Sequence, residues 1–488
     1  MKIVITAPEA VPFAKVGGLG DVAGTLPKLL AAMGHEVILV IPKYQQIEYR
    51  RYGFNPCMDS MGVQTGNGVE WCKVHLRNDP AGFRVFLIEH HLYFSRPGIY
   101  DHEGRAFDDN GLRFAFFCMA VLQLCRELNF FADVIHCHDW PTALIPALLK
   151  IHCGDDPVLG NAGSVLTIHN LAYQGKLPSS AFAYAGFPPA TWTPQIFEDH
   201  GQINFLKGGI VFADLLNTVS PTYAREILSD VGGAGLHRLL ANRQADLHGI
   251  LNGVDYTEWN PEIDAFIPAH YSHNNLSGKK RCKAALQKDL GLTVDPKAPL
   301  CGVVARLTDQ KGIHLVANAV DAITGMGGQL AVLGTGEKQL EDFFRWVPSR
   351  YPGRVGSLIG FDNYRAHLIE AGSDLYLMPS LFEPCGLNQI YALRYGTIPV
   401  VRATGGLEDT VSEYDPVTGT GTGFKFHDIS LGSFIGAVSR AIHIYLYRPR
   451  QFAAMQKRAM EMRFTWEQSV ERYLDLYQWA IAKRKAWR

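Results

Sequence analysis

Residues 2–33 read KIVITAPEAVPFAKVGGLGDVAGTLPKLLAAM: a short β-rich run, a turn, and an apolar segment that fits a helix. The turn, KVGGLGD at 15–21, holds three glycines and one cation. Glycine lets the backbone approach a ligand closely, and the N-terminus of the following helix offers unpaired N–H groups with partial positive charge. The stretch therefore predicts the first strand-turn-helix unit of a parallel α/β sheet, with a turn suited to a phosphate or a polar sugar.

The strand-helix alternation continues through the first half of the chain. Strand-like runs occur at 35–42 (HEVILVIP), 132–140 (ADVIHCHDW) and 164–175 (SVLTIHNLAYQG). The last two end in polar residues, so we expect these side chains at one carboxyl edge of the sheet, where open α/β folds bind ligands. Residues 44–110 look less regular apart from RVFLIEH, and 178–205 are expected to form an insertion or a helix-containing lid.

Asp139 and Trp140, at this predicted edge, suggest a carbohydrate contact. Asp139 offers a carboxylate for hydroxyl groups beside the aromatic face of Trp140. His169 and Asn170 follow the next strand and extend the same polar edge, although a histidine at a strand end can also be a satisfied structural residue.

The second half of the chain repeats the pattern. Five strand-helix units begin at the strands PLCGVVARL, QLAVLGTG, RVGSLIGF, DLYLMPS and TIPVVRAT, which predicts a second doubly wound domain. Turn formers at 252–253 (NG) and 259–261 (WNP) place the boundary near 255–265. The predicted fold is α/β, with Rossmann-like domains at 1–255 and 256–455 and a C-terminal helix at 456–488 that packs back across them.

Length and composition limit the class of protein. At 488 residues two or three domains are expected, and the net charge of −1 from 46 basic and 47 acidic residues provides no field for nucleic acid or an anionic membrane. The nine cysteines contain no CxxC pair, which argues against a disulfide framework and favours a reducing cytoplasm. No charged leader precedes an apolar run, and the most apolar stretch, at 111–125, is interrupted by Arg113. We expect a cytoplasmic protein with no nucleic-acid or membrane partner.

Common cofactor patterns fit poorly. Residues 18–23 (GLGDVA) formally match G-x-G-x-x-A, but the next strand ends in Pro42-Lys43, without the acidic residue that would hold a ribose. No GxxxxGK[ST] phosphate loop occurs. His136 and His138 face the same side of a strand, yet no third ligand motif accompanies them, so a metal site is not favoured.

Three cations and one carboxylate lie on loops after strands. Lys15 lies on such a loop in the first half. Arg306 and Lys311 share one strand-to-helix connection and would give a forked donor and a point charge for a pyrophosphate, unless both are solvated surface residues. Glu383 lies between a strand and a helix, where it could accept sugar hydroxyls, balance positive charge at a reacting carbon, or cap the helix. Cys385 is a candidate reactive thiol or a small packed residue.

Seven segments together resemble a known family. KVGGLGDV, HCHDWPTALIP, TIHNLAYQG, GILNGVDYTEWNP, ARLTDQKG, FEPCGLNQIYALRYGTIPVV and ATGGLEDTV are similar, in order and over nearly the whole chain, to the bacterial glycogen synthase and plant starch synthase family. The resemblance implies a GT-B fold, with two Rossmann-like domains facing each other over a deep cleft. It also implies retaining transfer of glucose from ADP-glucose to the non-reducing end of an α-1,4-glucan such as glycogen, without a metal or other cofactor. The absence of Asp-x-Asp agrees.

Site roles follow from the resemblance position by position. Lys15, Arg306 and Lys311 would hold the diphosphate, with Gly18 allowing close backbone approach. Asp21 and Asp139 would line the acceptor side, and His169, with Asn170 beside it, would contact the donor glucose near its reacting carbon. Glu383 would bind donor hydroxyls. The remaining donor contacts would come from Asn252, Phe361 as part of the adenine shelf, the N–H groups of Cys385, Gly386 and Leu387, and the turn at Thr404 and Gly405.

Two departures and several alternatives remain. Many retaining GT-B enzymes have a second, ribose-binding glutamate where this chain has Tyr391, so ribose recognition stays open; Asn388 stands where relatives often have Thr, a substitution expected to be tolerated. No residue stands out as a covalent nucleophile, which favours same-face attack by the acceptor hydroxyl, with a diphosphate oxygen taking its proton. The alternatives are a GT-B enzyme that uses UDP-glucose or a small-sugar acceptor, an inactive glucan-binding protein, and a dehydrogenase.

Overall fold

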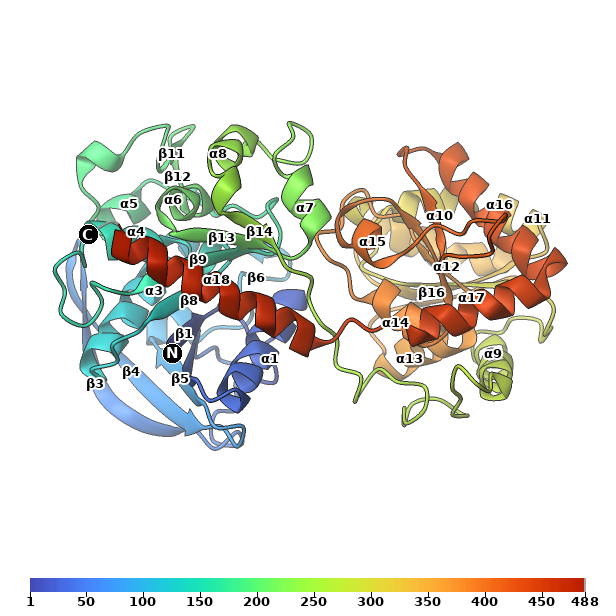
Figure 1. The fold of residues 1–488 in the computed structure, drawn as a ribbon, viewed down its shortest axis with the longest axis horizontal. Helices are drawn as coiled ribbons and strands as arrows, with labels where there is room; N and C mark the ends of the chain where they lie inside the picture. Colours follow the sequence, from blue (N-terminus) through green and yellow to red (C-terminus); the bar gives the residue numbers. More distant parts are fainter. Residues whose placement is uncertain (487–488) are drawn as a thin grey trace. The chain divides into compact units, whose positions relative to one another are not determined.

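The computed structural model describes residues 1–486 and divides the chain into two compact units (Figure 1). Unit 1 comprises Met1–Val219, Ala224–Ile250 and the segment from Trp466 on, whereas unit 2 comprises Ser220–Tyr223 and Leu251–Thr465. The divisions thus fall at 250/251 and 465/466, against the expected 255/256 and 455/456. No helix within residues 1–486 is long and apolar enough to cross a membrane.

Unit 1 is built on a nine-stranded sheet in the order β14-β13-β9-β8-β1-β2-β5-β4-β3. The strands from β14 to β5 are parallel, and β4 and β3 are antiparallel to their neighbours. Ile3, Val4 and Ile5 of β1 have no exposed surface, as expected of a parallel strand covered on both faces. The strands are β1 (Lys2–Thr6), β2 (Glu36–Pro42), β3 (Asn55–Thr65), β4 (Gly68–Asn78), β5 (Arg84–Glu89), β8 (Val134–His138), β9 (Gly163–Ile168), β13 (Leu215–Thr218) and β14 (Leu247–Gly249).

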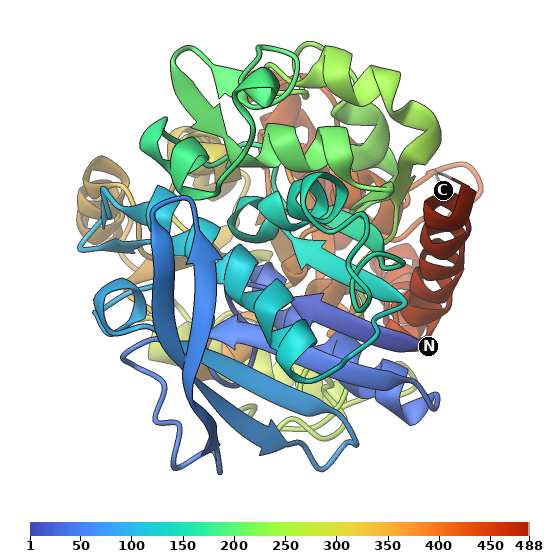
Figure 2. The same cartoon turned by 90° about the vertical axis from the view of Figure 1, so that its left-hand side faces the viewer.

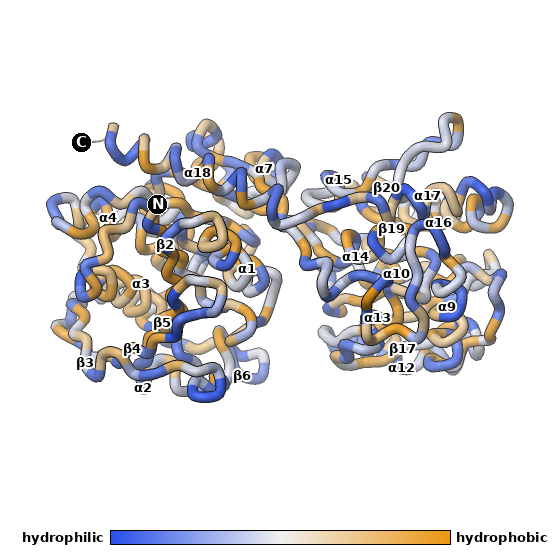
Figure 3. Tube along the Cα trace, turned by 60° about the horizontal axis from the view of Figure 1, so that its bottom comes forward, coloured by the Kyte–Doolittle hydropathy of each residue, from blue (hydrophilic) through white to orange (hydrophobic). Residues whose placement is uncertain are grey.

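The helices of unit 1 pack on this sheet and on one another. They are α1 (Gly18–Ala32), α2 (His91–Phe94), α3 (Asn110–Glu127), α4 (Leu144–Ile151), α5 (Ser180–Tyr184), α6 (Phe205–Phe212), α8 (His237–Asn242) and α18 (Trp466–Ala486), while α7 (Pro221–Glu226) is divided between the units. Helix α3 is almost entirely buried and hydrophobic (Figure 3), and its fully buried Arg113 donates hydrogen bonds to the carbonyls of Tyr93 and Ile99. The apolar stretch interrupted by Arg113 is therefore a core helix of unit 1.

The C-terminal helix α18 belongs to unit 1. It packs on β9 and α1 (Figure 1, red), and Gly163 permits the contact because a Cβ there would lie 3.0 Å from the backbone of Ala480. Helix α17 (Pro449–Glu461) instead buries Phe452, Met455 and Ala459 in the core of unit 2. The expected return of the chain at residue 456 therefore comes ten residues later, at Trp466.

Unit 2 contains a six-stranded parallel sheet in the order β17-β16-β15-β18-β19-β20. The strands are β15 (Leu300–Val304), β16 (Gln329–Gly334), β17 (Val355–Ile359), β18 (Leu375–Met378), β19 (Ile398–Arg402) and β20 (Phe424–Phe426). The helices are α9 (Ser277–Asp289), α10 (Ile313–Asn318), α11 (Val320–Gly325), α12 (Lys338–Arg350), α13 (Asn363–Gly372), α14 (Asn388–Arg394), α15 (Gly405–Thr410), α16 (Leu431–Tyr447) and α17. All five predicted strand-helix units are present, and β20 adds a sixth strand.

Two stretches that look less regular in the sequence contain paired strands. Strands β3 and β4 form a long antiparallel pair (Figure 2, blue arrows), and β6 (Asp101–His102) pairs with β7 (Arg105–Ala106). Within 178–205, β10 (Lys176–Pro178), β12 (Gln202–Asn204) and β11 (Glu198–Asp199) form a three-stranded sheet beside α5. The first stretch, expected to be less regular, holds paired strands.

Candidate active site

Each sheet has one position where the strand order reverses. In unit 1, β1 and β8 are neighbours; β2 lies on the far side of β1, and β9 lies on the far side of β8. In unit 2, β15 and β18 are neighbours in the same way, with β16 beyond β15 and β19 beyond β18. Open parallel sheets bind ligands outside the carboxyl ends of strands at such a point, because the loops there separate and leave a crevice. The predicted residues all follow strands: Lys15, Gly18 and Asp21 after β1; Asp139 after β8; His169 and Asn170 after β9; Asn252 after β14; Arg306 and Lys311 after β15; Phe361 after β17; Glu383, Cys385, Gly386 and Leu387 after β18; Thr404 and Gly405 after β19.

The turn at 15–21 is held by Glu9, a residue that the sequence does not single out. Glu9, only 3% exposed, accepts hydrogen bonds through one oxygen, Oε2, from the N–H groups of Val16 and Gly17, the latter at 3.3 Å. Burial raises the pKa of Glu9 to about 7, although these two hydrogen bonds oppose the shift. The only sequence signal for Glu9 is an acid shortly after the first strand. Because Glu9 occupies these two donors, the turn is less open to an anion than its glycines suggest.

The cation and the acid of this turn are paired. Lys15 Nζ lies 2.7 Å from Asp21 Oδ1, with half of the Lys15 side chain exposed. Gly18 begins α1, and a Cβ there would meet nothing within 4 Å. Gly24 is the glycine that packing requires, since a Cβ would lie 2.4 Å from the carbonyl oxygen of Val11. It allows α1 to pack closely on the loop after β1.

Asp139 connects the ends of β8 and β9. Its backbone has a φ of 56°, and Oδ1 accepts a 2.6 Å hydrogen bond from the N–H of His169. A second bond comes from the N–H of Asn170, whose own Oδ1 accepts from Ala172 N at 3.0 Å. Burial nevertheless raises the pKa of Asp139 to about 8. The prediction that Asp139, His169 and Asn170 share one edge of the sheet is confirmed. The Asp139 carboxylate holds the loop after β9 in place through these hydrogen bonds.

The histidines of β8 lie side by side, as strand alternation predicts. The rings of His136 and His138 have centroids 4.1 Å apart, and both are fully buried. His138 Nδ1 lies 2.9 Å from His169 Nε2. Trp140 is half-buried among aromatic rings, with Phe114 at 4.9 Å in an edge contact, rather than a free platform for a sugar.

In unit 2 the loops after β15 and β18 meet. Lys311 Nζ lies 2.6 Å from Glu383 Oε2, which also accepts a 3.0 Å hydrogen bond from Ser380 Oγ. The Lys311 and Glu383 side chains are 18% and 7% exposed. Glu383 therefore pairs with a cation from a neighbouring loop.

Glycines fix these loops against one another. Gly312 has a φ of 65°, and a Cβ there would lie 1.9 Å from the carbonyl oxygen of Pro379. At Gly405, φ is 45° and a Cβ would lie 2.0 Å from the carbonyl oxygen of Glu383. The N–H of Gly406 donates to that same carbonyl at 3.1 Å. The positions of Lys311, Glu383 and the turn at 404–405 are therefore set by direct backbone packing.

Several polar groups around Glu383 have no hydrogen-bond partner within residues 1–486. The N–H groups of Cys385, Gly386 and Leu387 make no hydrogen bond there. Asn252 is 5% exposed, and its Oδ1 is buried without a partner. Burial raises the pKa of the Cys385 thiol to about 12, so Cys385 is a packed, protonated thiol and not a reactive one. Unpaired amides beside a buried amide oxygen suit a ligand that carries both phosphate oxygens and hydroxyls.

The outer residues of this edge are open to solvent. Arg306 is exposed, and Phe361, directly after β17, is 90% exposed.

Asn388 donates a hydrogen bond to the carbonyl of Val304 at 2.7 Å and so helps to hold the end of β15. Tyr391 stacks on Trp259 with ring centroids 4.2 Å apart. The structure thus explains what Asn388 and Tyr391 contact, and leaves the ribose partner open.

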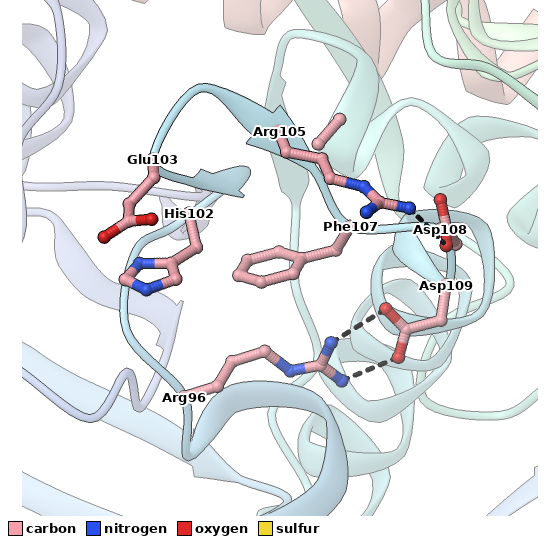
Figure 4. A pocket seen from close by; sticks show the side chains of 8 residues that line it. Arg96, His102, Glu103, Arg105, Phe107, Asp108 and Asp109 are labelled. Atoms are coloured by element: carbon pink, nitrogen blue, oxygen red, sulfur yellow. Dashed lines mark hydrogen bonds and ion pairs between the residues drawn. The ribbon is translucent and has the colours of Figure 1, made fainter.

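Two pockets of unit 1 are lined by none of the predicted residues. One, of about 520 Å³, lies at the β6–β7 hairpin, where Arg96 forms a forked contact with Asp109 and Arg105 approaches Asp108 (Figure 4). The other, of about 800 Å³, is lined by residues that include Lys150 and Arg243. In the described part of the chain, no group of three or more His, Cys, Asp or Glu side chains is arranged to hold a metal ion.

Comparison with known proteins identifies the family. A model of the starch synthase catalytic domain matches residues 2–242, and a model of glycosyl transferases group 1 matches residues 291–451. Glycogen synthase 1 of Geobacter metallireducens is 43% identical over 99% of this chain and 97% of its own length. The chain belongs to the glycogen synthase and starch synthase family. Another member, a glycogen synthase of Anaeromyxobacter sp. (strain Fw109-5), is 46% identical over 98% of this chain and 99% of its own length.

Solved structures of the family and its neighbours establish the fold. The catalytic domain of starch synthase IV from Arabidopsis thaliana, bound to ADP and acarbose, has a TM-score of 0.89 and 33% identity over 99% of both chains. Sucrose-phosphate synthase from Thermosynechococcus elongatus, at 18% identity and a TM-score of 0.61 over 99% of both chains, shares the fold. The predicted GT-B fold with two Rossmann-like domains is confirmed, and this member of the glycogen synthase and starch synthase family is a glycosyltransferase.

Proposed function

We propose that this chain transfers glucose from ADP-glucose to the non-reducing end of an α-1,4-glucan, with retention of anomeric configuration, and so elongates glycogen. One observation carries the assignment: Lys311 and Glu383 form a 2.6 Å pair bordered by the free N–H groups of residues 385–387. This group offers a cation and amides for phosphate oxygens, and a carboxylate for sugar hydroxyls. Family membership and the starch synthase that binds ADP and acarbose support the same reading.

The donor is assigned to the carboxyl edge of the unit 2 sheet. Arg306 and Lys311 would bind the diphosphate, and their charges would stabilise the ADP leaving group. Phe361, exposed beside β17, would stack on the adenine, and the buried Oδ1 of Asn252 would accept a hydrogen bond from the donor. The turn at Thr404 and Gly405, fixed on the Glu383 carbonyl, would complete the nucleotide end.

The acceptor is assigned to the carboxyl edge of the unit 1 sheet. Asp21 and Asp139 would face glucan hydroxyls, and His169, with Asn170 beside it, would lie near the reacting carbon. Lys15 would supply a third cation to the diphosphate, which requires it to exchange the 2.7 Å contact with Asp21 for the donor. No covalent nucleophile is assigned; the acceptor 4-hydroxyl attacks from the face that the diphosphate leaves, and a diphosphate oxygen takes its proton.

The proposal includes no metal or other cofactor, because the three cations provide the charge that a divalent ion would otherwise supply. It also includes no nucleic-acid or membrane partner, consistent with a net charge of −1. We further propose a cytoplasmic location, which the nine cysteines, all free thiols in this structure, support.

A donor comparison tests the proposal. Purified protein is incubated with glycogen and either ADP-glucose or UDP-glucose, with EDTA present, and nucleotide release is measured. We expect release from ADP-glucose that depends on glycogen, and a loss of at least 100-fold in Glu383→Ala. Preferred use of UDP-glucose, or activity with maltose but not with glycogen, would favour the alternative donor or acceptor. Activity abolished by EDTA would overturn the metal-free reaction.

A further inference from the structure

Three buried histidines of unit 1 lie in a row behind the predicted acceptor edge. His136 and His138 have no exposed surface, and His169 is 9% exposed. Burial lowers the pKa of His136 and of His169 to about 3, and lowers that of His138 well below its ordinary value. Each ring therefore carries a single proton near neutral pH, and its tautomer decides which nitrogen donates.

The tautomer of His136 follows from its partners. Asn217 uses its amide Nδ2 to donate to the carbonyls of Thr218 and His248, so its Oδ1 is the acceptor for the hydroxyl of Thr167 at 2.8 Å. The Thr167 hydroxyl has only one proton, and it must accept from His136 Nε2 at 2.6 Å. His136 Nδ1 is then free to accept from the hydroxyl of Tyr477, 2.8 Å away on α18.

For His138 and His169 two arrangements are geometrically possible. Their facing atoms, His138 Nδ1 and His169 Nε2, lie 2.9 Å apart and share one proton. If His169 donated, the proton of His138 would sit on Nε2, which is buried without a partner in the described residues. If His138 donates, its Nε2 carries no proton and is only an acceptor without a donor. Buried N–H groups without an acceptor are rarer than acceptors without a donor, which favours donation by His138.

We propose that His138 is a positioning residue that donates its Nδ1 proton to His169 Nε2 and thereby fixes His169 in the Nδ1–H tautomer. His169 then presents an N–H group at the carboxyl edge. Its backbone N–H is already held by Asp139 at 2.6 Å, so ring position and ring tautomer are set by two different neighbours.

The consequence for chemistry rests on the proposed function. A histidine with Nδ1–H donates a hydrogen bond to a sugar oxygen and cannot take a proton from the acceptor hydroxyl through that atom. His138 therefore makes the His169 ring a hydrogen-bond donor to substrate. The proton of the acceptor hydroxyl is then taken by a diphosphate oxygen. The opposite tautomer would make His169 Nδ1 a potential general base.

The tautomer can be measured without any substrate. The full-length protein is labelled with ¹⁵N in its histidine rings, and long-range ¹H–¹⁵N spectra are recorded near pH 7.5, where protonated and unprotonated ring nitrogens have separate shifts. The His169 signals are assigned by their disappearance in His169→Asn. We expect a protonated Nδ1 and an unprotonated Nε2 for both His169 and His138.

Variants then test whether His138 is responsible. His138→Asn can place an amide N–H near the position of Nδ1, whereas His138→Phe keeps an aromatic ring and supplies no donor. We expect the Asn variant to keep the His169 tautomer and most of kcat. The Phe variant should give mixed His169 tautomers and a kcat lower by ~10-fold, the effect of losing one buried hydrogen bond, with KM for glycogen unchanged. His136→Phe is the matched control, since it alters an equally buried histidine that does not bond to His169, and it should leave the His169 tautomer intact.

Two results would overturn the inference. One is a His169 signal in the wild type with the proton on Nε2. The other is a folded His138→Phe variant with the wild-type tautomer and kcat. If the protein transferred no glucose at all, the proposed function would fall while the spectra of the ligand-free protein would still decide the role of His138.

Discussion

The Lys311–Glu383 pair allows the donor site and the stability of unit 2 to be tested together. Replacing Lys311 by Met removes the cation 2.6 Å from Glu383 Oε2 and leaves the carboxylate with Ser380 as its remaining partner. Because the side chains of the pair are only 18% and 7% exposed, solvent compensates little for the loss. Removing one partner of such a buried pair costs about 3 kcal/mol of unfolding free energy.

The double variant separates two roles of Lys311. Glu383→Gln removes the charge that Lys311 neutralises, so Lys311→Met with Glu383→Gln should recover most of the lost stability. It should not recover activity, because the diphosphate would still lack its cation; we expect kcat/KM for ADP-glucose to remain at least 100-fold below wild type.

Denaturant unfolding and initial rates with glycogen check both expectations on the same four proteins: wild type, each single variant and the double variant. A Lys311→Met variant as stable as wild type would show that the Lys311–Glu383 pair does not stabilise unit 2. Recovery of ADP-glucose turnover in the double variant would refute the assignment of Lys311 to the diphosphate.

Three further predictions concern other parts of the site. Burial raises the pKa of Glu9 to about 7, so the folded protein favours the protonated carboxyl; the stabilisation from Glu9 is present below pH 4.5 and is lost as the pH rises through about 7. Relative to Glu9→Gln, the unfolding free energy of wild type should therefore fall by about 3 kcal/mol between pH 4.5 and 8. A difference between the two proteins that does not change with pH would contradict this. Gly312→Ala should lower the unfolding free energy by about 2 kcal/mol or more and lower turnover, because the new Cβ would meet the carbonyl of Pro379. Gly325→Ala is the control: a Cβ there would meet nothing within 4 Å, so a denaturant titration should show unchanged stability. Phe361→Ala should raise KM for ADP-glucose about 5-fold with an unchanged unfolding midpoint, since the ring is exposed; an unchanged KM would remove Phe361 from the adenine site.

Much of the fold could be predicted because parallel α/β units leave a strong pattern. Strands such as β1 and β16 are continuous apolar runs, and each ends in glycine or polar residues that belong to the ligand edge. The antiparallel pair β3–β4 was not recognised because β3 (NPCMDSMGVQT) is largely exposed and interrupted by register shifts, so its apolar residues do not alternate. The two-residue Gly66-Asn67 turn between the two strands is the signal that locates the pair.

The location of the candidate residues on loops after strands could be predicted, but the partners of these residues could not. Glu9 and Val16 are seven positions apart, and only the fold of the intervening loop brings the carboxylate to the amides of the turn. Likewise, His138 reaches His169 across two neighbouring strands, and Lys311 reaches Glu383 across 72 positions of sequence. Such contacts depend on strand order, which a periodicity does not specify.

The proposed reaction transfers glucose from ADP-glucose to the non-reducing ends of an α-1,4-glucan. The most direct measurement follows radiolabelled glucose from ADP-glucose into glycogen and then digests the product with β-amylase, which removes maltose from α-1,4-linked non-reducing ends. We expect glycogen to become labelled and β-amylase to release the label as maltose. Absence of label in glycogen, or label that resists β-amylase, would contradict it.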